Sequence, residues 1–167
     1  MRRILCIGSV FAFLSVATVA QAQEAAIQGA WVLSSTADSA GNVNEAPLPG
    51  LFVFTGTHYS MMYAIGDGPR EGYAGDDQTD EERLAAYDTF IANTGRYAVD
   101  GDQLTFRAYV AKDPNYMGEW PENATTVTIH IDGGTLQWTW GAEFDPAIGQ
   151  VFTFSRVEGQ PAPWDQD

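Results

Sequence analysis

Apolar and polar residues alternate through most of this chain, with a period of two that is typical of half-buried β-strands. Turn signals separate the runs: Gly56-Thr57, Asp100-Gly101-Asp102 and Gly133-Gly134 are all suited to short hairpin connections. The pattern predicts eight strands, over Gly29–Thr36, Leu51–Thr55, Tyr59–Ile65, Gly95–Val99, Gln103–Lys112, Thr125–Ile131, Thr135–Trp140 and Gln150–Val157.

One segment between the third and fourth strands reads as a helix. Thr79 with Glu82 three residues later has the spacing of a capping box, and Asn93-Thr94-Gly95 is a typical helix stop. Leu84, Tyr87 and Ile91 are spaced to form a single apolar stripe along this segment. The acidic run 76–82 then belongs to the cap and a solvated face, because it lacks the glycine and terminal glutamate of a calcium loop.

Eight antiparallel strands expose two edges unless the sheet closes on itself. We therefore predict an all-β fold, an eight-stranded up-and-down antiparallel barrel with one helix inserted between strands 3 and 4. Gly29 at the start of the first strand allows another backbone to come close, and Trp31 points inward to plug that end. Arg156, on the last strand, can stack on the Trp31 ring and reach carbonyls at the closed end.

The interior of this barrel is predicted to be apolar and rich in aromatic rings. Along the fifth strand, Leu104, Phe106, Ala108 and Val110 share the inward phase. Arg107 lies on the opposite phase and is most simply a surface charge, although a reversed phase would let it meet a ligand carboxylate. The residues expected to contact a ligand are Tyr59, Met61, Tyr63, Phe106, Trp138 and Trp140. A barrel of this size either is filled by its side chains or holds one small ligand, and both alternatives stay open.

The two ends of the chain read differently from its middle. Residues 1–22 resemble a secretion signal, with Arg2 and Arg3 before an apolar run and Ala20-Gln21-Ala22 at the cleavage site. This run is shorter than the roughly 20 residues of a membrane helix. We expect an exported protein, periplasmic or extracellular and not inserted in a membrane, with a barrel domain over 23–157 and a disordered tail over 158–167.

Charge narrows the choice of partner. The chain carries 22 acidic and 8 basic residues, a net charge of −14, and loss of Arg2 and Arg3 with the signal makes it −16. The electrostatic field of such a negative net charge repels nucleic acids and anionic membrane surfaces, so a small hydrophobic ligand is the expected partner. The oligomeric state is left open. Cys6, the only cysteine, falls within the signal, so no disulfide is expected in the mature chain.

A search for catalytic chemistry returns little. The chain has no G-x-S-x-G, H-E-x-x-H or phosphate-binding loop motif, and its two histidines, His58 and His130, are too few for a three-histidine metal site. Asp113 and Glu119 flank the loop Pro114–Gly118 without an evident partner base. We assign no catalytic residue, no metal and no cofactor.

Several motifs in order carry a resemblance to a known family. Gly29-x-Trp31 with Arg156 on the last strand resembles the calycin signature, and the chain as a whole resembles the bacterial lipocalin-like domain family. The motifs concerned read Gly29–Ser35, Gly50–Thr55 into His58–Met61, Thr79–Glu82, Asn93–Gly101 and Pro114–Gly118. The resemblance implies a lipocalin-type barrel. Members often carry a histidine and an arginine where this chain has Phe106-Arg107 and Thr126-Val127-Thr128, so a polar site kept there is altered or absent.

Three functions are consistent with these observations. The first is an exported protein that binds a small hydrophobic or amphipathic molecule inside its barrel without catalysis. The second is a barrel enzyme, a cyclase, isomerase or hydrolase, that acts on such a molecule through tyrosines and Arg107. The third is an interaction module with a filled core and a functional outer surface.

Overall fold

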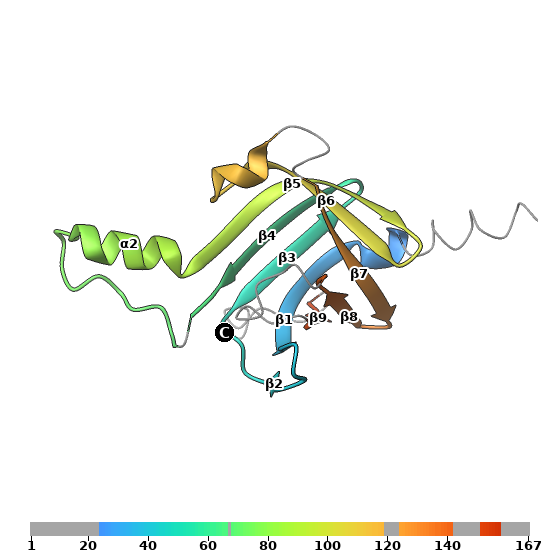
Figure 1. The fold of residues 1–167 in the computed structure, drawn as a ribbon, viewed down its shortest axis with the longest axis horizontal. Coiled ribbons are helices and arrows are strands. Elements are labelled where there is room, and N and C mark those ends of the chain that lie inside the picture. The colour runs from blue at the N-terminus through green and yellow to red at the C-terminus, as the bar shows by residue number, and fades with distance from the viewer. Residues whose placement is uncertain (1–23, 67, 119–123, 142–150, 158–167) are drawn as a thin grey trace, which may run out of the picture.

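The computed structural model describes residues 24–66, 68–118, 124–141 and 151–157 (Figure 1). The predicted signal segment 1–22 and the predicted tail 158–167 lie outside this part of the chain, as does Glu119. Residues 24–27 are helical, and the further helical elements are α2 (Asp80–Asp88) and the short 3-10 helix η1 (Pro114–Met117). The strands are β1 (Gly29–Ala37), β2 (Val43–Asn44), β3 (Gly50–Thr55), β4 (His58–Ala64), β5 (Phe90–Asp100), β6 (Gln103–Ala111), β7 (Ala124–Asp132), β8 (Thr135–Thr139) and β9 (Val151–Arg156).

The strands form a closed antiparallel barrel. From β3 to β9 each strand pairs with the next along the chain, and β1 pairs with both β3 and β9. The predicted eight-stranded up-and-down barrel is therefore confirmed. The sequence pattern missed β2, whose two residues pair with the far end of β1 after a turn built on Asp38. That carboxylate accepts hydrogen bonds from the backbone N–H groups of Ala40 and Asn42, and these local bonds bring the chain back.

The seam between β1 and β9 has the predicted construction. Trp31 is fully buried and lies directly opposite Arg156, whose guanidinium carbon is 4.1 Å from the centroid of the indole ring. The same guanidinium donates to the carbonyls of Gln28 and Ala26, each at 2.6 Å. The indole Nε1 of Trp31 donates to the carbonyl of Ile27 at 2.8 Å. This pair joins the first strand to the last and ties the preceding segment over the end of the barrel.

The barrel interior is packed with aromatic rings. Trp138 is fully buried near its middle, with ring centroids of Phe52, Phe106 and Phe154 4.9 to 5.0 Å away. Alternate residues of each strand enter this core, as the period of two predicts. One inward assignment was wrong: Val110 is 61% exposed. A bulge causes this, because Thr94 pairs with Val110 whereas Gly95 pairs with Ala108, which leaves Tyr109 as an extra residue on β6.

The helix is shorter than predicted and does not cover the barrel. It ends at Asp88, and residues 90–94 belong to β5, where they pair with β4 from Ala64 to Ser60. The cross-strand hydrogen bonds of this pairing override the local helix-stop signal. Leu84 and Tyr87, two members of the predicted apolar stripe, are 60% and 50% exposed, and no residue of α2 is buried. Figure 1 shows α2 projecting from the end of the barrel opposite the N-terminal segment.

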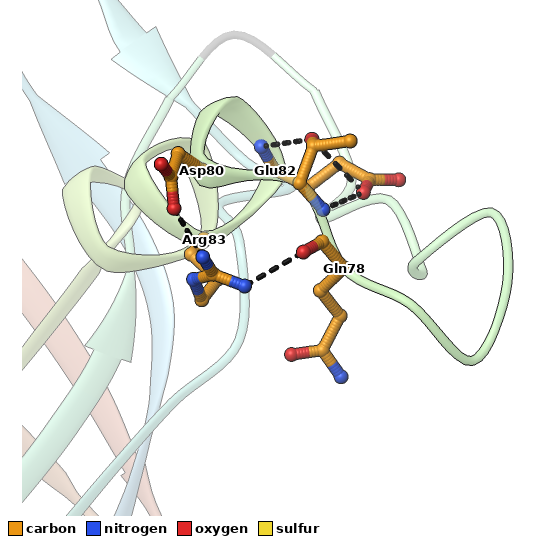
Figure 2. A network of polar contacts seen from close by, with 5 residues as sticks. Gln78, Asp80, Glu82 and Arg83 are labelled. Atoms are coloured by element: carbon orange, nitrogen blue, oxygen red, sulfur yellow. Dashed lines mark hydrogen bonds and ion pairs between the residues drawn. The ribbon is translucent and has the colours of Figure 1, made fainter.

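The start of α2 is the capping box that the sequence predicts (Figure 2). The Thr79 hydroxyl accepts from the backbone N–H of Glu82, and the Glu82 carboxylate accepts from the backbone N–H of Thr79. These hydrogen bonds hold the pKa of the Glu82 carboxyl below its usual value. Arg83 pairs with Asp80 and donates to the carbonyl of Gln78. Within the described ranges, no helix is long and apolar enough to cross a membrane.

Candidate ligand-binding cavity

A cavity of about 70 Å³ lies in the half of the barrel away from the Trp31 seam. Four strands and η1 contribute to its wall. The lining is mostly apolar or aromatic and consists of Tyr59, Met61, Tyr63, Ile91, Asn93, Phe106, Ala108, Tyr116, Thr125 and Trp140.

The space lies beside the last residues of β6. The described pairing of β6 with β7 runs from Gln103 to Arg107, and β6 then leads into η1. Ala108, the first inward residue beyond that point, has a small side chain and lines the cavity. Tyr116 of η1, 40% exposed, forms part of the rim. The small side chain of Ala108 leaves room between the surrounding rings.

The β6 bulge brings two backbones unusually close beside the cavity. A Cβ placed on Gly95 would lie 1.9 Å from the carbonyl oxygen of Arg107 and 2.9 Å from the Cα of Ala108. No side chain can be accommodated there without a backbone shift. Gly95 is thus required by close approach, and it sets the position of β5 residues just before it, including Asn93.

Five of the six residues predicted to contact a ligand line the cavity. They are Tyr59, Met61, Tyr63, Phe106 and Trp140. Trp138 is not among the lining residues: its ring is fully buried and packs against Phe106 and Trp140, at 5.0 and 5.9 Å between ring centroids.

Sequence reasoning placed Ala108 on the inward phase but missed other residues of the lining. Ile91 and Asn93 were assigned to the helix and its stop, whereas they are inward residues of β5. The sequence places Tyr116 in a loop, and no local sequence pattern shows where this loop lies relative to the barrel. A strand assignment extended back from Gly95 with the same period of two would have placed Ile91 and Asn93 on the inward phase.

The polar groups of the described lining include the amide of Asn93 and the phenols of Tyr59 and Tyr63. The Asn93 side-chain oxygen Oδ1 is buried and has no hydrogen-bond partner among the described residues. Burial raises the pKa of the Tyr59 phenol well above its usual value. Burial also raises the pKa of the Tyr63 phenol, and the nearby Tyr116 adds to the rise. Both phenols are therefore neutral at physiological pH, and they can donate or accept a hydrogen bond but do not act as anions.

The remaining sequence candidates lie elsewhere. Arg107 is half-buried on the outward phase of β6, opposite Arg96 and Ala124, and is not among the residues that line the cavity. His58 and His130 are exposed, and Asp113 accepts from the backbone N–H of Asn115 at the start of η1. No group of three or more metal-ligating side chains occurs in the described part of the chain.

A second hollow lies on the outside of the barrel. This outer groove has a volume of about 820 Å³ and is lined mainly by outward residues of β1, β3 and β4 and by the segments that flank them. Arg70 is the charged residue of its lining, and it donates to the carbonyl of Ala86 at 2.8 Å. The full lining is Val32, Leu48, Pro49, Gly50, Leu51, Met62, Tyr63, Ala64, Pro69, Arg70 and Phe90.

Comparison with known proteins gives one structural similarity. No protein-family model matches the chain, and no curated protein matches it in sequence. Among solved structures, a lipocalin-like protein from Bacteroides uniformis ATCC 8492 is similar at a TM-score of 0.46 and 16% sequence identity. The match covers 78% of this chain and 98% of that one.

Proposed function

We propose that this protein is an exported binding protein that holds one end of a small hydrophobic or amphipathic molecule in the cavity lined by Tyr59, Tyr63 and Trp140. The observation that carries the proposal is the cavity itself, a mostly apolar and ring-lined space inside the barrel. Concave apolar sites with a few polar groups are the usual form of small-molecule sites in proteins.

The size of the cavity limits what enters it. At about 70 Å³ the cavity is well below the roughly 300–1,000 Å³ of a typical ligand site, so it takes in only part of a drug-sized molecule. A long chain or a polycyclic body does not fit inside the barrel as it stands. The ligand therefore inserts one end, and the rest of the molecule lies at the rim beside Tyr116.

The chemistry of the wall supports binding rather than catalysis. A barrel enzyme that used tyrosine as a general base would require a phenol with a lowered pKa, whereas burial raises the pKa of both Tyr59 and Tyr63. Arg107, the other residue of the enzyme hypothesis, does not line the cavity.

The first test identifies the ligand and the mature chain together. Protein purified from its own host is analysed by native mass spectrometry and by N-terminal sequencing. We expect a bound small molecule and a chain that begins at Gln23, following removal of residues 1–22. A chain that retains its first residues would contradict export through this signal.

The second test fills the cavity. Ala108→Leu places a larger side chain in the cavity, and Ala98→Leu makes the same change at an exposed position of β5. Binding of small apolar probes, measured by calorimetry and by tryptophan fluorescence, should be lost in the first variant and kept in the second. Thr125→Leu is a further filling variant if Ala108→Leu does not fold. Equal binding by all variants would place the probes outside the barrel.

The outer groove favours a second candidate function, an interaction module. The closed half of the interior is filled by rings, and the outer groove is more than ten times larger than the cavity. Met62→Asp and Leu51→Asp would place charges in this groove and leave the cavity unchanged. If these variants lost the protein's ligand or partner while Ala108→Leu kept it, the function would reside on the outer face.

A further inference from the structure

The Asn93 amide oxygen is a polar atom of the cavity that the described residues leave without a hydrogen bond. It is buried, and the described residues offer it no donor. Most of the other described lining side chains are apolar or aromatic, such as Met61 and Ile91. A buried acceptor without a donor costs free energy, and any molecule that brings a donor to it recovers that cost. Asn93 thus marks the position of a hydrogen bond that comes from outside the chain.

Charge argues for a neutral donor. Among the described residues, the lining contains no acidic or basic side chain, and the phenols of Tyr59 and Tyr63 remain protonated. An ammonium or a carboxylate would enter without a counter-charge, which is costly in a buried site. The net charge of −14 further disfavours anions.

We propose that the cavity selects uncharged molecules that carry a hydroxyl or N–H donor at the end of an apolar body, and that the donor binds Asn93 Oδ1. This inference rests on the proposed function, because it describes the ligand of the same cavity. A water molecule that enters the cavity can also donate a hydrogen bond to this oxygen. A ligand without a donor displaces that water, and the oxygen then loses its hydrogen bond. A ligand with a donor keeps the bond and adds its apolar contacts with Tyr59 and Trp140.

The test compares phenol with toluene, which have the same shape and differ in one donor. Affinities of both probes are measured by calorimetry for the wild type, for Asn93→Leu and for the control Gln137→Leu, a similar change on the exposed face of β8. The ratio of phenol affinity to toluene affinity should fall by about tenfold or more in Asn93→Leu. It should be unchanged in Gln137→Leu, because Gln137 does not line the cavity.

A second measurement keeps the proposal testable if Asn93→Leu fails to fold. In NMR spectra of the wild type, phenol should shift the side-chain amide signals of Asn93 more than toluene does, whereas both probes should shift the methyl signal of Ala108. Equal shifts at Asn93 would contradict the proposed hydrogen bond.

The outcomes separate this inference from the proposed function. If both probes bind and the affinity ratio is the same in wild type and Asn93→Leu, the donor preference is refuted while the binding cavity stands. If neither probe binds the wild type or shifts Ala108, the proposed function fails and the inference fails with it. Tighter toluene binding in Asn93→Leu, with phenol weakened, is the result expected when Asn93 selects the donor.

Discussion

Aromatic side chains have opposite effects at the two ends of this barrel: they fill one end and surround a cavity at the other. At the closed end, Trp31 fills the interior, its Nε1 donates to Ile27, and Arg156 covers its ring and bonds to two carbonyls. At the other end, Tyr59 and Tyr63 surround a space, and the buried oxygen of Asn93 has no donor among the described residues.

The difference follows from how the strands meet at each end. At the seam, the first and last strands lie side by side, so an arginine on one can reach the backbone that leads into the other. At the cavity, the small side chain of Ala108 and the β6 bulge opposite Gly95 lie next to the space. At the closed end the polar groups of the seam are hydrogen-bonded, so this end contributes to stability. The end with the cavity has space for a ligand and an oxygen that can accept a hydrogen bond from it.

The largest expected effect is at the seam. Trp31→Ala should lower the free energy of unfolding by about 3–5 kcal/mol, measured by chemical denaturation, because it removes a fully buried ring. Trp140→Ala, at the cavity wall, should cost less, since space already adjoins that ring. In a double-mutant cycle Trp31→Ala and Arg156→Ala should couple by at least about 0.5 kcal/mol. Additive losses would show that the stacked pair is not a unit.

The second-largest loss of stability is expected at the β6 bulge. Gly95→Ala should lower the free energy of unfolding by about 1–3 kcal/mol or more, because the new Cβ meets the carbonyl of Arg107. Gly134→Ala is the matched control, since a Cβ there meets nothing within 4 Å. Gly95→Ala should also weaken probe binding, because the backbone shift moves Asn93. A stable variant with unchanged binding would mean that the bulge relaxes at no cost.

Alkaline pH should lower the free energy of unfolding through the buried phenol of Tyr63 at the cavity. The folded-state pKa of Tyr63 is raised above the unfolded value of about 10, so above that pH the unfolded chain releases a proton that the folded chain keeps. The free energy of unfolding is therefore highest below pH 10 and falls as pH rises further. Tyr63→Phe should make this fall less steep, and Tyr109→Phe, at an exposed position, should not. Identical slopes in all three proteins would contradict a buried neutral phenol.

Substitution of Asn93 at the cavity should change the free energy of unfolding by less, and in the opposite direction. Asn93→Leu removes the unpaired buried oxygen, so we expect the free energy of unfolding to rise by about 1 kcal/mol in the absence of ligand. Gln137→Leu should change it by less than about 0.5 kcal/mol. A clear destabilisation by Asn93→Leu would show that the amide already contributes to folding.

The smallest effect is expected outside the barrel. Thr79→Ala removes the capping oxygen of α2 and should weaken this helix by about 1 kcal/mol. Because no residue of α2 is buried, the loss should appear as faster hydrogen exchange of its amides, with β8 amides unchanged. A large loss of probe affinity in this variant would instead make the helix part of the binding site.

Features set by short spacings along the chain could be predicted from the sequence. The inward phase of Tyr59, Met61 and Tyr63 follows from alternation within one strand. The capping box depends on two residues three positions apart, and the seam on the expectation that the last strand of a barrel pairs with the first. Each of these is decided by local geometry or by the closure of the sheet, so the residue pattern alone was sufficient.

The cavity depends on contacts between distant segments, and only the tertiary structure decided it. Asn93 resembles part of a helix stop in the sequence, yet pairing with β4 makes it a strand residue, and its oxygen is left without a described partner. The bulge opposite Gly95 turns Val110 outward and breaks the alternation that predicts an inward residue. Cross-strand hydrogen bonds and close backbone contacts outweigh local propensity at these positions, because many such bonds form together when the barrel closes.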